Sequence, residues 1–389
     1  MPVALADGLS LITVEGLALE KGELSPPQSA MRDCHGSQCG FCTPGFVVTL
    51  AGLVDKRLAR GRKTPIQPQE AKNALTGNLC RCTGYQPILD AAAAMQVTEC
   101  EPLRDRHSSV AQEADLKRTR TQAVNMRGEE FRFEAPRSLR AASDILSKGA
   151  RGKALGKVGK QAMAPRLVSG ATDLGVVHNK RKIRLHSVLS LHLVPGLEQI
   201  QVKKERVKVG ARATLTQVRN ALEAFEPEFA RFLDLFASPQ IKNVATLAGN
   251  VANASPIGDT SPFLLAMDAQ VHAQGPKTRR KIPMDRFFLA YRKTALKRGE
   301  LIAAIEWKPR APRGDFLRLY KVSQRKDLDI CVVSCAFRVV WGKDGRVKDA
   351  RIALGGVAAT PVRLPRVEAL LRGREWNEEL RVRASGLLQ

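Results

Sequence analysis

The sequence predicts a multidomain protein: an all-α N-terminal domain, a larger α+β domain and a small α+β domain at the C-terminus. Its 389 residues suffice for two or three domains of ordinary size. Apolar residues recur with helical spacing between about Gln28 and Val97. After Phe131 the pattern changes to mixed strands and helices, separated by turns rich in small residues.

The N-terminal region carries the signals of three helices. Thr43 and Pro44 provide an N-cap followed by a proline at the first helical position, and apolar residues continue from there at helical spacing. A second helix is predicted from about Pro68 to Thr76, where Gly77 ends it, and a third begins near Pro87.

The mixed region alternates between strand and helix signals. The expected elements are a helix over Ser138–Leu146, a strand and glycine turn over Pro165–Val177, two strands over Leu197–Val209, a hairpin made by Cys331–Trp341 and Val347–Val357, and a helix over Pro365–Leu371. The Gly-, Lys- and Ala-rich segment Ala154–Ala164 is expected to be an insertion.

Composition narrows the classes of function. Lys and Arg outnumber Asp and Glu by 63 to 38, a formal charge of +25. The basic residues are dispersed and lack a nucleic-acid-binding motif, so we expect a solvated basic surface and no nucleic-acid partner. No apolar run reaches the ~18–20 residues of a transmembrane helix, and the N-terminus lacks the order of a secretory signal. The expectation is a cytoplasmic protein that does not bind membranes.

Cysteine placement indicates a metal site. Of eight cysteines, five lie between Cys34 and Cys82. Cys39-Gly40-Phe41-Cys42 and Cys80-Arg81-Cys82 flank one helical hairpin, so four thiolates from two turns can converge. Helix N-termini and Arg81 are expected to favour the thiolate forms. Iron–sulfur clusters and structural zinc both take four cysteines; the spacing leaves both open, although a Cys-X-Cys arm is less usual for zinc.

The residues around these cysteines resemble a known family. His35-Gly36-Ser37-Gln38-Cys39-Gly40-Phe41-Cys42-Thr43-Pro44-Gly45 and Gly77-Asn78-Leu79-Cys80-Arg81-Cys82-Thr83-Gly84-Tyr85 closely resemble the helical [2Fe–2S] domain of the xanthine dehydrogenase family. The resemblance implies that Cys39, Cys42, Cys80 and Cys82 bind one [2Fe–2S] cluster. Gln86 stands where relatives often carry Arg. The other thiols, Cys34, Cys100, Cys331 and Cys335, are expected to be buried or incidental.

Two turns of small residues in the mixed region indicate a nucleotide site. They span Leu167–Gly175 and Asn243–Asp259. Turns of this kind let backbone amides approach a pyrophosphate, because a Cβ would block the contact. The first turn alone fits a plain structural turn better, since it is not a GxGxxG fingerprint. The pair suggests a long, doubly anchored nucleotide such as FAD.

Both turns resemble the FAD-binding domain of the same dehydrogenases, of the PCMH or vanillyl-alcohol-oxidase-like fold rather than the Rossmann type. Further matches lie at Phe287–Thr294 and Tyr320–Arg325. The resemblance implies that FAD is bound by Leu167, Val168, Ser169, Gly170, Ala171, Thr172, Asp173, Leu174, Phe236, Thr246, Leu247, Ala248, Gly249, Asn250, Asp259, Ile302 and Lys321. Ser323–Asp329 corresponds to the loop beside the flavin and its NAD pocket.

Two positions depart from the family pattern of the FAD site. Ala248 replaces the first glycine of the usual Gly-Gly-Asn turn, and Pro239 stands where an arginine is common. If position 248 needs a positive φ, alanine there would strain the turn by about 1 kcal/mol.

The resemblance runs from Ala4 to Leu371 and is best to the separate small subunit of bacterial xanthine dehydrogenases. It implies a helical [2Fe–2S]-binding domain over 1–97, a linker over 98–126, an FAD-binding domain over 127–312 and a C-terminal domain over 313–389. Residues 1–16 match the exit of a ferredoxin-type domain whose C-x4-C-x2-C pattern the sequence lacks. The last domain resembles a shortened CO dehydrogenase flavoprotein C-terminal domain. The chain is therefore expected to be clipped at both ends.

The resemblance implies an oxidoreductase subunit of purine catabolism without catalytic residues of its own. Electrons from the molybdenum site of a large molybdopterin-binding partner subunit would pass through the [2Fe–2S] cluster and FAD to NAD, in a hetero-oligomer. Two alternatives stay open. One is a subunit of a related molybdenum hydroxylase that acts on an aldehyde or carbon monoxide, and the other is a degenerate docking subunit without catalytic function.

Overall fold

The computed structural model describes residues 3–129, 131–149, 157–158, 161–162, 164–311 and 313–387. The chain forms two compact units: a helical unit made mainly of Ala6–Thr121, and an α+β unit made mainly of Gln122–Ala237 and Ile241–Gln389. Most of the expected insertion Ala154–Ala164 lies outside the described residues. Among the helices that are described, none combines the length and the apolar character that crossing a membrane requires.

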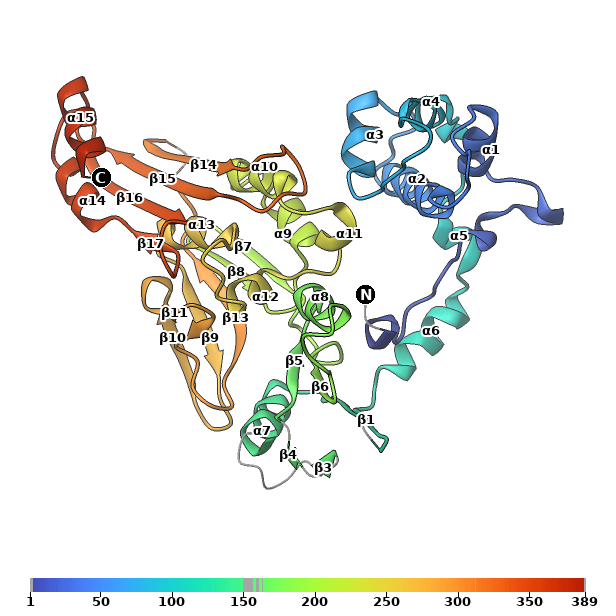
Figure 1. Ribbon diagram of the computed structural model, residues 1–389, viewed down its shortest axis with the longest axis horizontal. Helices are drawn as coiled ribbons and strands as arrows, with labels where there is room; N and C mark the ends of the chain where they lie inside the picture. Colours follow the sequence, from blue (N-terminus) through green and yellow to red (C-terminus); the bar gives the residue numbers. More distant parts are fainter. Residues whose placement is uncertain are drawn as a thin grey trace. The chain divides into compact units, whose positions relative to one another are not determined.

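The helical unit is drawn in blue to cyan in Figure 1. Its α-helices are α1 (Pro26–Asp33), α2 (Thr43–Leu58), α3 (Pro68–Leu75), α4 (Gln86–Ala94), α5 (Leu103–His107) and α6 (Val110–Thr119), joined by the short 3₁₀ helices η2 (Glu15–Leu17), η3 (Glu20–Gly22) and η4 (Val97–Glu99). Helices α1 to α4 each carry a proline in the first two positions, where its missing N–H costs no hydrogen bond. Phe46, Leu50 and Ile88 are fully buried, so α2 and α4 form the centre of this core.

The segment expected to be a linker without periodicity contains α5 and α6. Local interactions explain these helices, because α6 buries none of its residues. Ser109 and Gln112 form a reciprocal capping box at the start of α6. Nε and Nη2 of Arg104 donate to the two carboxylate oxygens of Glu113, at 2.6 and 2.7 Å. A helix stabilised by such polar contacts does not need apolar residues at helical spacing, so the sequence shows no periodic pattern there.

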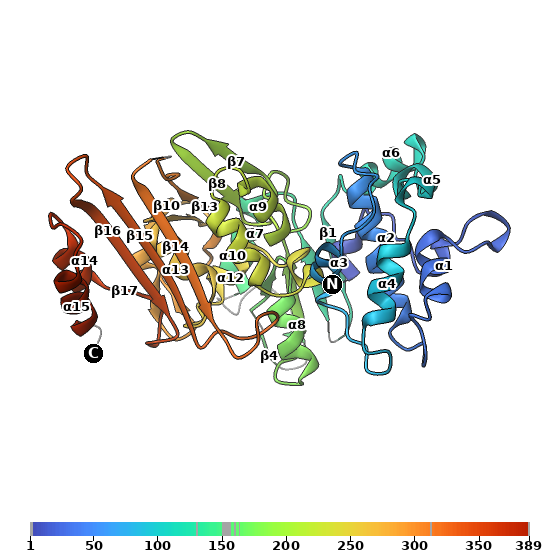
Figure 2. The ribbon, with the colours of Figure 1, turned by 90° about the horizontal axis from the view of Figure 1, so that it is seen from above.

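The α+β unit contains three larger sheets (Figures 1 and 2). The first has the order β1 (Val124–Arg127), β2 (Arg132–Ala135), β6 (Ser187–Ser190), β5 (Arg166–Val168), and β2, β6 and β5 are parallel. The second is antiparallel, in the order β10 (Arg279–Pro283), β9 (Gln270–Gln274), β13 (Leu301–Trp307), β8 (Arg206–Gly210), β7 (Ile200–Lys203). The third, also antiparallel, has the order β14 (Asp315–Val322), β15 (Val333–Trp341), β16 (Val347–Gly355), β17 (Val362–Arg363).

Helices and short hairpins complete this unit. The helices are α7 (Leu139–Gly149), α8 (Thr172–Asn179), α9 (Leu215–Leu222), α10 (Pro227–Leu235), α11 (Pro239–Lys242), α12 (Leu247–Ala252), α13 (Thr260–Ala266), α14 (Pro365–Leu371) and α15 (Glu378–Gly386), with η5 at Met284–Arg286. The hairpins are β3 (Lys157–Val158) with β4 (Gln161–Ala162), and β11 (Phe288–Ala290) with β12 (Lys293–Thr294). The helices predicted over Ser138–Leu146 and Pro365–Leu371 and the hairpin around residues 342–345 are confirmed as α7, α14 and β15–β16.

The β14–β17 sheet, which we call the C-terminal sheet, is covered by helices on both faces. Alternate residues of its strands, among them Leu317, Ala336 and Ala353, join the main core beneath α13, whose seven residues are all buried. The opposite face packs under α14 and α15 through a smaller apolar cluster around Ile352. The sheet therefore separates two cores, and α13 lies on the side of the main one.

Candidate functional site

The first candidate site lies in two loops of the helical unit. Cys42 is the N-cap of α2, and Cys80 and Cys82 lie between α3 and α4. The sulfur of Cys82 lies 3.6 Å from that of Cys39 and 3.8 Å from that of Cys80. Two sulfurs bound 2.3 Å from one tetrahedral metal would be about 3.8 Å apart. The structure thus brings the four predicted cysteines together at a spacing that suits thiolate–metal bonds.

The local environment shifts the pKa values of the Cys80 and Cys42 thiols in opposite directions. The Thr83 hydroxyl lies 3.0 Å from the Cys80 sulfur and lowers the pKa of Cys80 to about 6. Burial, followed by a hydrogen bond and the charge of Cys80, raises the pKa of Cys42 to about 11. At Cys42, burial and the neighbouring Cys80 thus act against the acidifying effect of the helix N-terminus. Crowded thiolates of this kind need a cation to neutralise them.

Successive contacts link the four sulfurs in a row: Cys39 with Cys82, Cys82 with Cys80, and Cys80 with Cys42. Among the described residues, no three His, Cys, Asp or Glu side chains are arranged to hold a single metal ion. A row offers neighbouring pairs of sulfurs, and an iron of a [2Fe–2S] cluster takes two cysteine ligands. The donor set therefore fits a two-iron cluster.

The second candidate site begins where two turns of the α+β unit touch. A Cβ built on Gly170 would lie 1.9 Å from the carbonyl oxygen of Val244, so the first turn packs directly on the backbone before Thr246. Ala171 adopts a left-handed conformation (φ 57°) and begins α8 without a side-chain cap. The first N–H groups of α8 therefore have no partner within the helix, as a diphosphate-binding turn requires. Gly170, however, is required by contact between the turns and not only by approach of a ligand.

The second turn is a capped helix start. Thr246 Oγ1 accepts a hydrogen bond from the N–H of Gly249 at 3.0 Å, so that N–H already has a partner, whereas the Thr246 hydroxyl can still donate. Ala248 lies inside α12 and does not have a positive φ. The strain considered for alanine at this position is therefore absent, because helix geometry suits it better than glycine. Asn250 Oδ1 accepts from the Thr260 hydroxyl at 2.6 Å, which ties this turn to α13.

A buried ion pair joins α13 to the C-terminal sheet. The ammonium of Lys321 on β14 lies 2.9 Å from Oδ2 of Asp259, with 2% and 8% of the two side chains exposed. The same ammonium lies 5.8 Å from the centre of the Phe236 ring. Oδ1 of Asp259 is buried without a hydrogen bond of ordinary geometry, although the Cys331 thiol lies close to it. An unsatisfied buried carboxylate oxygen is an acceptor for a hydroxyl of a bound nucleotide.

The remaining expected residues lie on β13, at the end of α10, at the start of α11 and in the loop after β14. Ile302 on β13 is buried in the main core with Leu247 and Ala248, and Phe236 packs against that core. Pro239 is the first residue of α11, a position that proline suits. The Ser323–Asp329 loop is held by Asp329, which accepts from the backbone N–H of Arg325 at 2.9 Å. These residues fit FAD in the chemistry of their donors and acceptors.

Sequence reasoning assigned no role to several residues that shape these sites. Thr83 lowers the pKa of Cys80, and the Tyr85 hydroxyl accepts the Cys80 backbone N–H at 3.1 Å. Both lie in the motif that contains the cysteines, so their positions offered a signal. Cys331, expected to be incidental, lies beside Asp259; burial and then the negative charge of Asp259 raise the pKa of Cys331 to about 12. No motif in the sequence links these two positions.

Three family models match the chain in order. They are the "[2Fe-2S] binding domain" over residues 13–93, the "FAD binding domain in molybdopterin dehydrogenase" over 129–307, and the "CO dehydrogenase flavoprotein C-terminal domain" over 318–389. The chain thus contains a [2Fe–2S]-binding and an FAD-binding domain. These domains and the two sites define an iron–sulfur flavoprotein that transfers electrons.

The sequence is similar to those of xanthine dehydrogenases. Xanthine dehydrogenase/oxidase of Gallus gallus is 27% identical over 457 residues, which cover 100% of this chain and 32% of that protein. Xanthine dehydrogenase of Emericella nidulans is 30% identical, with 97% of this chain and 30% of that protein covered. The predicted resemblance to the iron–sulfur and FAD-binding module of molybdenum hydroxylases is therefore confirmed. The chain spans about a third of the length of these curated relatives.

Solved structures agree with the fold. Carbon monoxide dehydrogenase from Hydrogenophaga pseudoflava matches with a TM-score of 0.60 and 25% identity, over 67% of this chain and 87% of that one. Quinoline 2-oxidoreductase from Pseudomonas putida 86 matches with a TM-score of 0.57 and 22% identity, over 67% of this chain and 86% of that one, which shows the fold alone.

Proposed function

We propose that the chain is the electron-transfer subunit of a xanthine dehydrogenase. It receives electrons from the molybdenum site of a molybdopterin-binding partner subunit and passes them to NAD. The observation that supports the proposal is the presence of two candidate sites on one chain: the row of four cysteine sulfurs, and the buried Asp259–Lys321 pair in the unit that holds the two turns of small residues. The resemblance of the whole chain to xanthine dehydrogenases supports the choice of reaction.

We propose that Cys39, Cys42, Cys80 and Cys82 hold one [2Fe–2S] cluster. Thr83 stabilises the Cys80 thiolate, and the exposed side chains of Cys39 and Cys82 leave one side of the site open to an electron donor. Phe41 and Leu79, which are 95% and 81% exposed, border the same loops and suit contact with a protein partner. When bound, the cluster supplies one-electron transfer.

We propose that the Leu167–Leu174 and Thr246–Asn250 turns bind the diphosphate of FAD, and that Phe236, Asp259, Ile302 and Lys321 surround the rest of it. The uncapped start of α8 donates N–H groups, and Asp259 Oδ1 accepts from a hydroxyl. Lys321 adds a buried positive charge. When bound, the flavin exchanges a hydride with NAD and single electrons with the cluster. The loop Ser323–Asp329 is the proposed NAD contact.

The test uses the full chain reconstituted anaerobically with iron, sulfide and FAD. NADH added in a rapid-mixing experiment should bleach the flavin absorbance. The iron and flavin contents should be two and one per chain, as the proposed cluster and FAD site require. Zinc in place of iron would contradict the cluster, and bound flavin that NADH does not reduce would contradict the NAD assignment.

A related molybdenum hydroxylase is the second candidate. Nicotinate hydroxylase of Emericella nidulans is 29% identical over 96% of this chain. The chain purified with its partner subunit should be assayed with xanthine, nicotinate, an aldehyde and carbon monoxide. Reduction of NAD by xanthine supports the first proposal, and turnover of another substrate alone supports the second. A partner complex that contains no flavin and no iron would indicate a docking role.

A further inference from the structure

We propose that Asp268 is a positioning residue for the flavin site: it fastens the C-terminal sheet to the end of α13 and thereby holds Lys321 against Asp259. The inference rests on the proposed function, because it takes the Asp259–Lys321 pair as part of the FAD site. Asp268 lies outside every residue assigned to that site.

The backbone at Asp268 marks the position as unusual. Asp268 follows α13 directly after its C-cap residue Met267 and adopts a left-handed conformation, with φ 47°. Glycine is the common residue at this place after a helix, because other side chains are strained there. Aspartate and asparagine tolerate the conformation best among the others. A carboxylate at this position therefore suggests a use for its charge.

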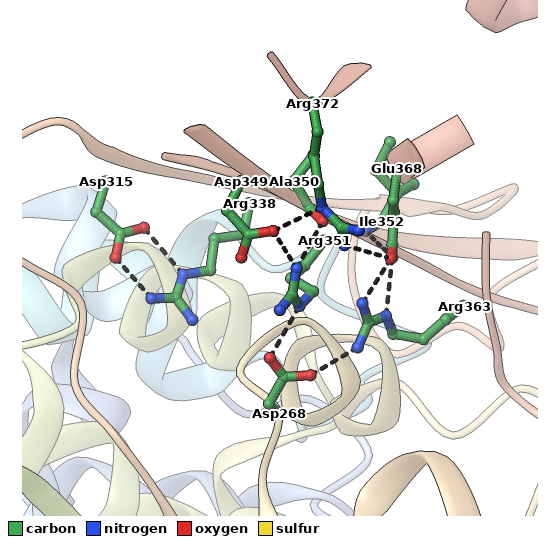
Figure 3. Close-up of polar contacts among 10 residues, drawn as sticks. All are labelled: Asp268, Asp315, Arg338, Asp349, Ala350, Arg351, Ile352, Arg363, Glu368 and Arg372. Carbon is green, nitrogen blue, oxygen red and sulfur yellow. Dashed lines mark hydrogen bonds and ion pairs between the residues drawn. The ribbon is translucent and has the colours of Figure 1, made fainter. Parts of the chain in front are cut away.

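Both oxygens of that carboxylate contact the C-terminal sheet (Figure 3). Oδ2 accepts from Nε of Arg351 on β16 at 2.8 Å, and Oδ1 accepts from Nη1 of Arg363 on β17 at 2.6 Å. Asp268 thus bridges two neighbouring strands of one sheet. A carboxylate that binds two strands resists sliding of the sheet across the helix.

The two arginines are themselves held in place. Arg363 donates to both oxygens of Glu368 on α14, at 2.8 and 2.6 Å, and Glu368 is buried and also accepts from the backbone N–H of Ile352 at 2.9 Å. Arg351 also pairs with Asp349. Because α14 lies on the opposite face of the sheet, this network ties all three layers together. Held arginines lose less side-chain entropy when they pair.

The opposite end of α13 carries the flavin-site pair. Asp259 is the N-cap residue of α13, and Lys321, Ser334 and Gly355 form one rung across β14, β15 and β16. Asp259 and Asp268 are nine residues apart on a helical path, about 13 Å. Gly355 and Arg351 are four residues apart on β16, also about 13 Å. The helix and the strand thus match in length, and an ion pair joins α13 to the C-terminal sheet at each end, to Lys321 on β14 and to Arg351 on β16.

The matched lengths connect the two ends mechanically. Directly after this rung, the N–H of Gly356 donates to the carbonyl of Pro256, in the segment before α13, at 2.9 Å. A shift of the sheet along α13 would move Lys321 away from Asp259 and from the Phe236 ring. Asp268 opposes that shift from the far end. Since Asp268 is half exposed, its ion pairs are modest individually, and their effect on the site should be moderate.

The test is a double-mutant cycle on the dissociation constant of FAD, measured by flavin fluorescence on the full apo-chain. Asp268→Asn keeps the tolerated backbone and removes the charge, and should weaken FAD binding about three- to tenfold. In the Lys321→Met background the same change should have no further effect on FAD affinity, because Asp268 acts through Lys321. Glu378→Gln is the matched control; it removes an exposed carboxylate of α15 that pairs with Arg381 of the same helix and lies outside the Asp268 network, and it should leave FAD affinity unchanged.

Each outcome decides one proposal. Wild-type chain that binds no FAD contradicts the proposed function. Wild-type binding together with unchanged affinity of Asp268→Asn overturns the positioning role alone. An effect of Asp268→Asn that persists in full with Lys321→Met also overturns it, because a merely structural contribution would add. If Asp268→Asn does not fold, Arg351→Gln removes one of the two contacts and enters the same cycle with the same criteria.

Discussion

Lys321 and Asp259 are 62 positions apart in the chain, yet the Lys321 ammonium lies 2.9 Å from Asp259 Oδ2 in a region that water scarcely reaches. The pair joins the segment that matches an FAD-binding domain to the segment that matches a separate C-terminal domain. Its energy depends on both partners, since a buried charge without its partner is strongly unfavourable.

Removing one partner of this pair should destabilise the protein. Lys321→Met leaves the Asp259 carboxylate buried and unpaired, which should cost about 3–5 kcal/mol. The double variant Asp259→Asn/Lys321→Met removes both charges and should regain part of that loss. Denaturant unfolding of the apo-chains measures both values. Equal stability of wild type and Lys321→Met would show that the pair does not form in solution.

Cys80→Ser should abolish cluster assembly, because a serine hydroxyl cannot replace the Cys80 thiolate, which the Thr83 hydroxyl stabilises by lowering the Cys80 pKa to about 6. Iron content and the visible spectrum after anaerobic reconstitution are the measurements. Cys100→Ser is the matched control: Cys100 is half-buried in the same unit, where its thiol donates to the Gln96 carbonyl, and it should keep the cluster. Loss of iron in both variants would contradict the assignment.

Gly170→Ala should destabilise the α+β unit by about 1–3 kcal/mol, because the new Cβ would overlap the Val244 carbonyl and two backbones must separate. Gly175→Ala, five residues further on in α8, meets no atom within 4 Å. It should be neutral or stabilising by up to about 1 kcal/mol through helix propensity. Thermal unfolding of the apo-chains distinguishes them, and a stable Gly170→Ala apo-chain would argue against the close contact of the turns.

Glu300 should make the free energy of unfolding depend on pH in the acid range. A hydrogen bond from Arg280, foremost, lowers the pKa of Glu300 below its usual range, and only 3% of the Glu300 side chain is exposed. The contribution is complete above the unfolded-state pKa of about 4.3 and is lost as the pH falls through the lower folded-state pKa. The melting temperature of Glu300→Gln should therefore lie below that of wild type at neutral pH and approach it near pH 3 or so.

Glu205→Gln is the control for this pH dependence. Glu205 pairs with Lys308 at 2.8 Å, but both side chains are about 70% exposed, so the loss should be small at every pH. A difference between Glu300→Gln and wild type that stays constant down to acid pH would contradict the role of the Glu300 charge.

Elements marked by local signals could be predicted from the sequence. Thr43-Pro44 gave the start of α2, and the glycines at 342 and 345 gave the β15–β16 turn. The cysteine arms could be recognised because each site residue lies within a short motif. Helix α6 could not, because Ser109, Gln112 and Arg104 stabilise it without burying an apolar face.

The geometry of the candidate flavin site was harder to predict from the sequence. A turn of small residues predicts that another group packs closely against its backbone. The sequence does not say whether the group next to Gly170 is a ligand or the Val244 carbonyl. Likewise, the strain considered at Ala248 depended on a backbone angle that only the fold of α12 determines. Asp268 is separated in the sequence from Arg351 by 83 positions and from Arg363 by 95. No periodic pattern of residues predicts contacts over such separations.

The complete burial of α13 bears on how this part of the family evolves. The two family models divide the α+β unit between residues 307 and 318, but a chain cut there would expose the face of α13 that packs against the C-terminal sheet. Recombination between relatives can therefore exchange these two segments only as one block. A gene that acquires one half from a different lineage must restore Lys321, Arg351 and Arg363 opposite Asp259 and Asp268, so these five positions should be inherited together.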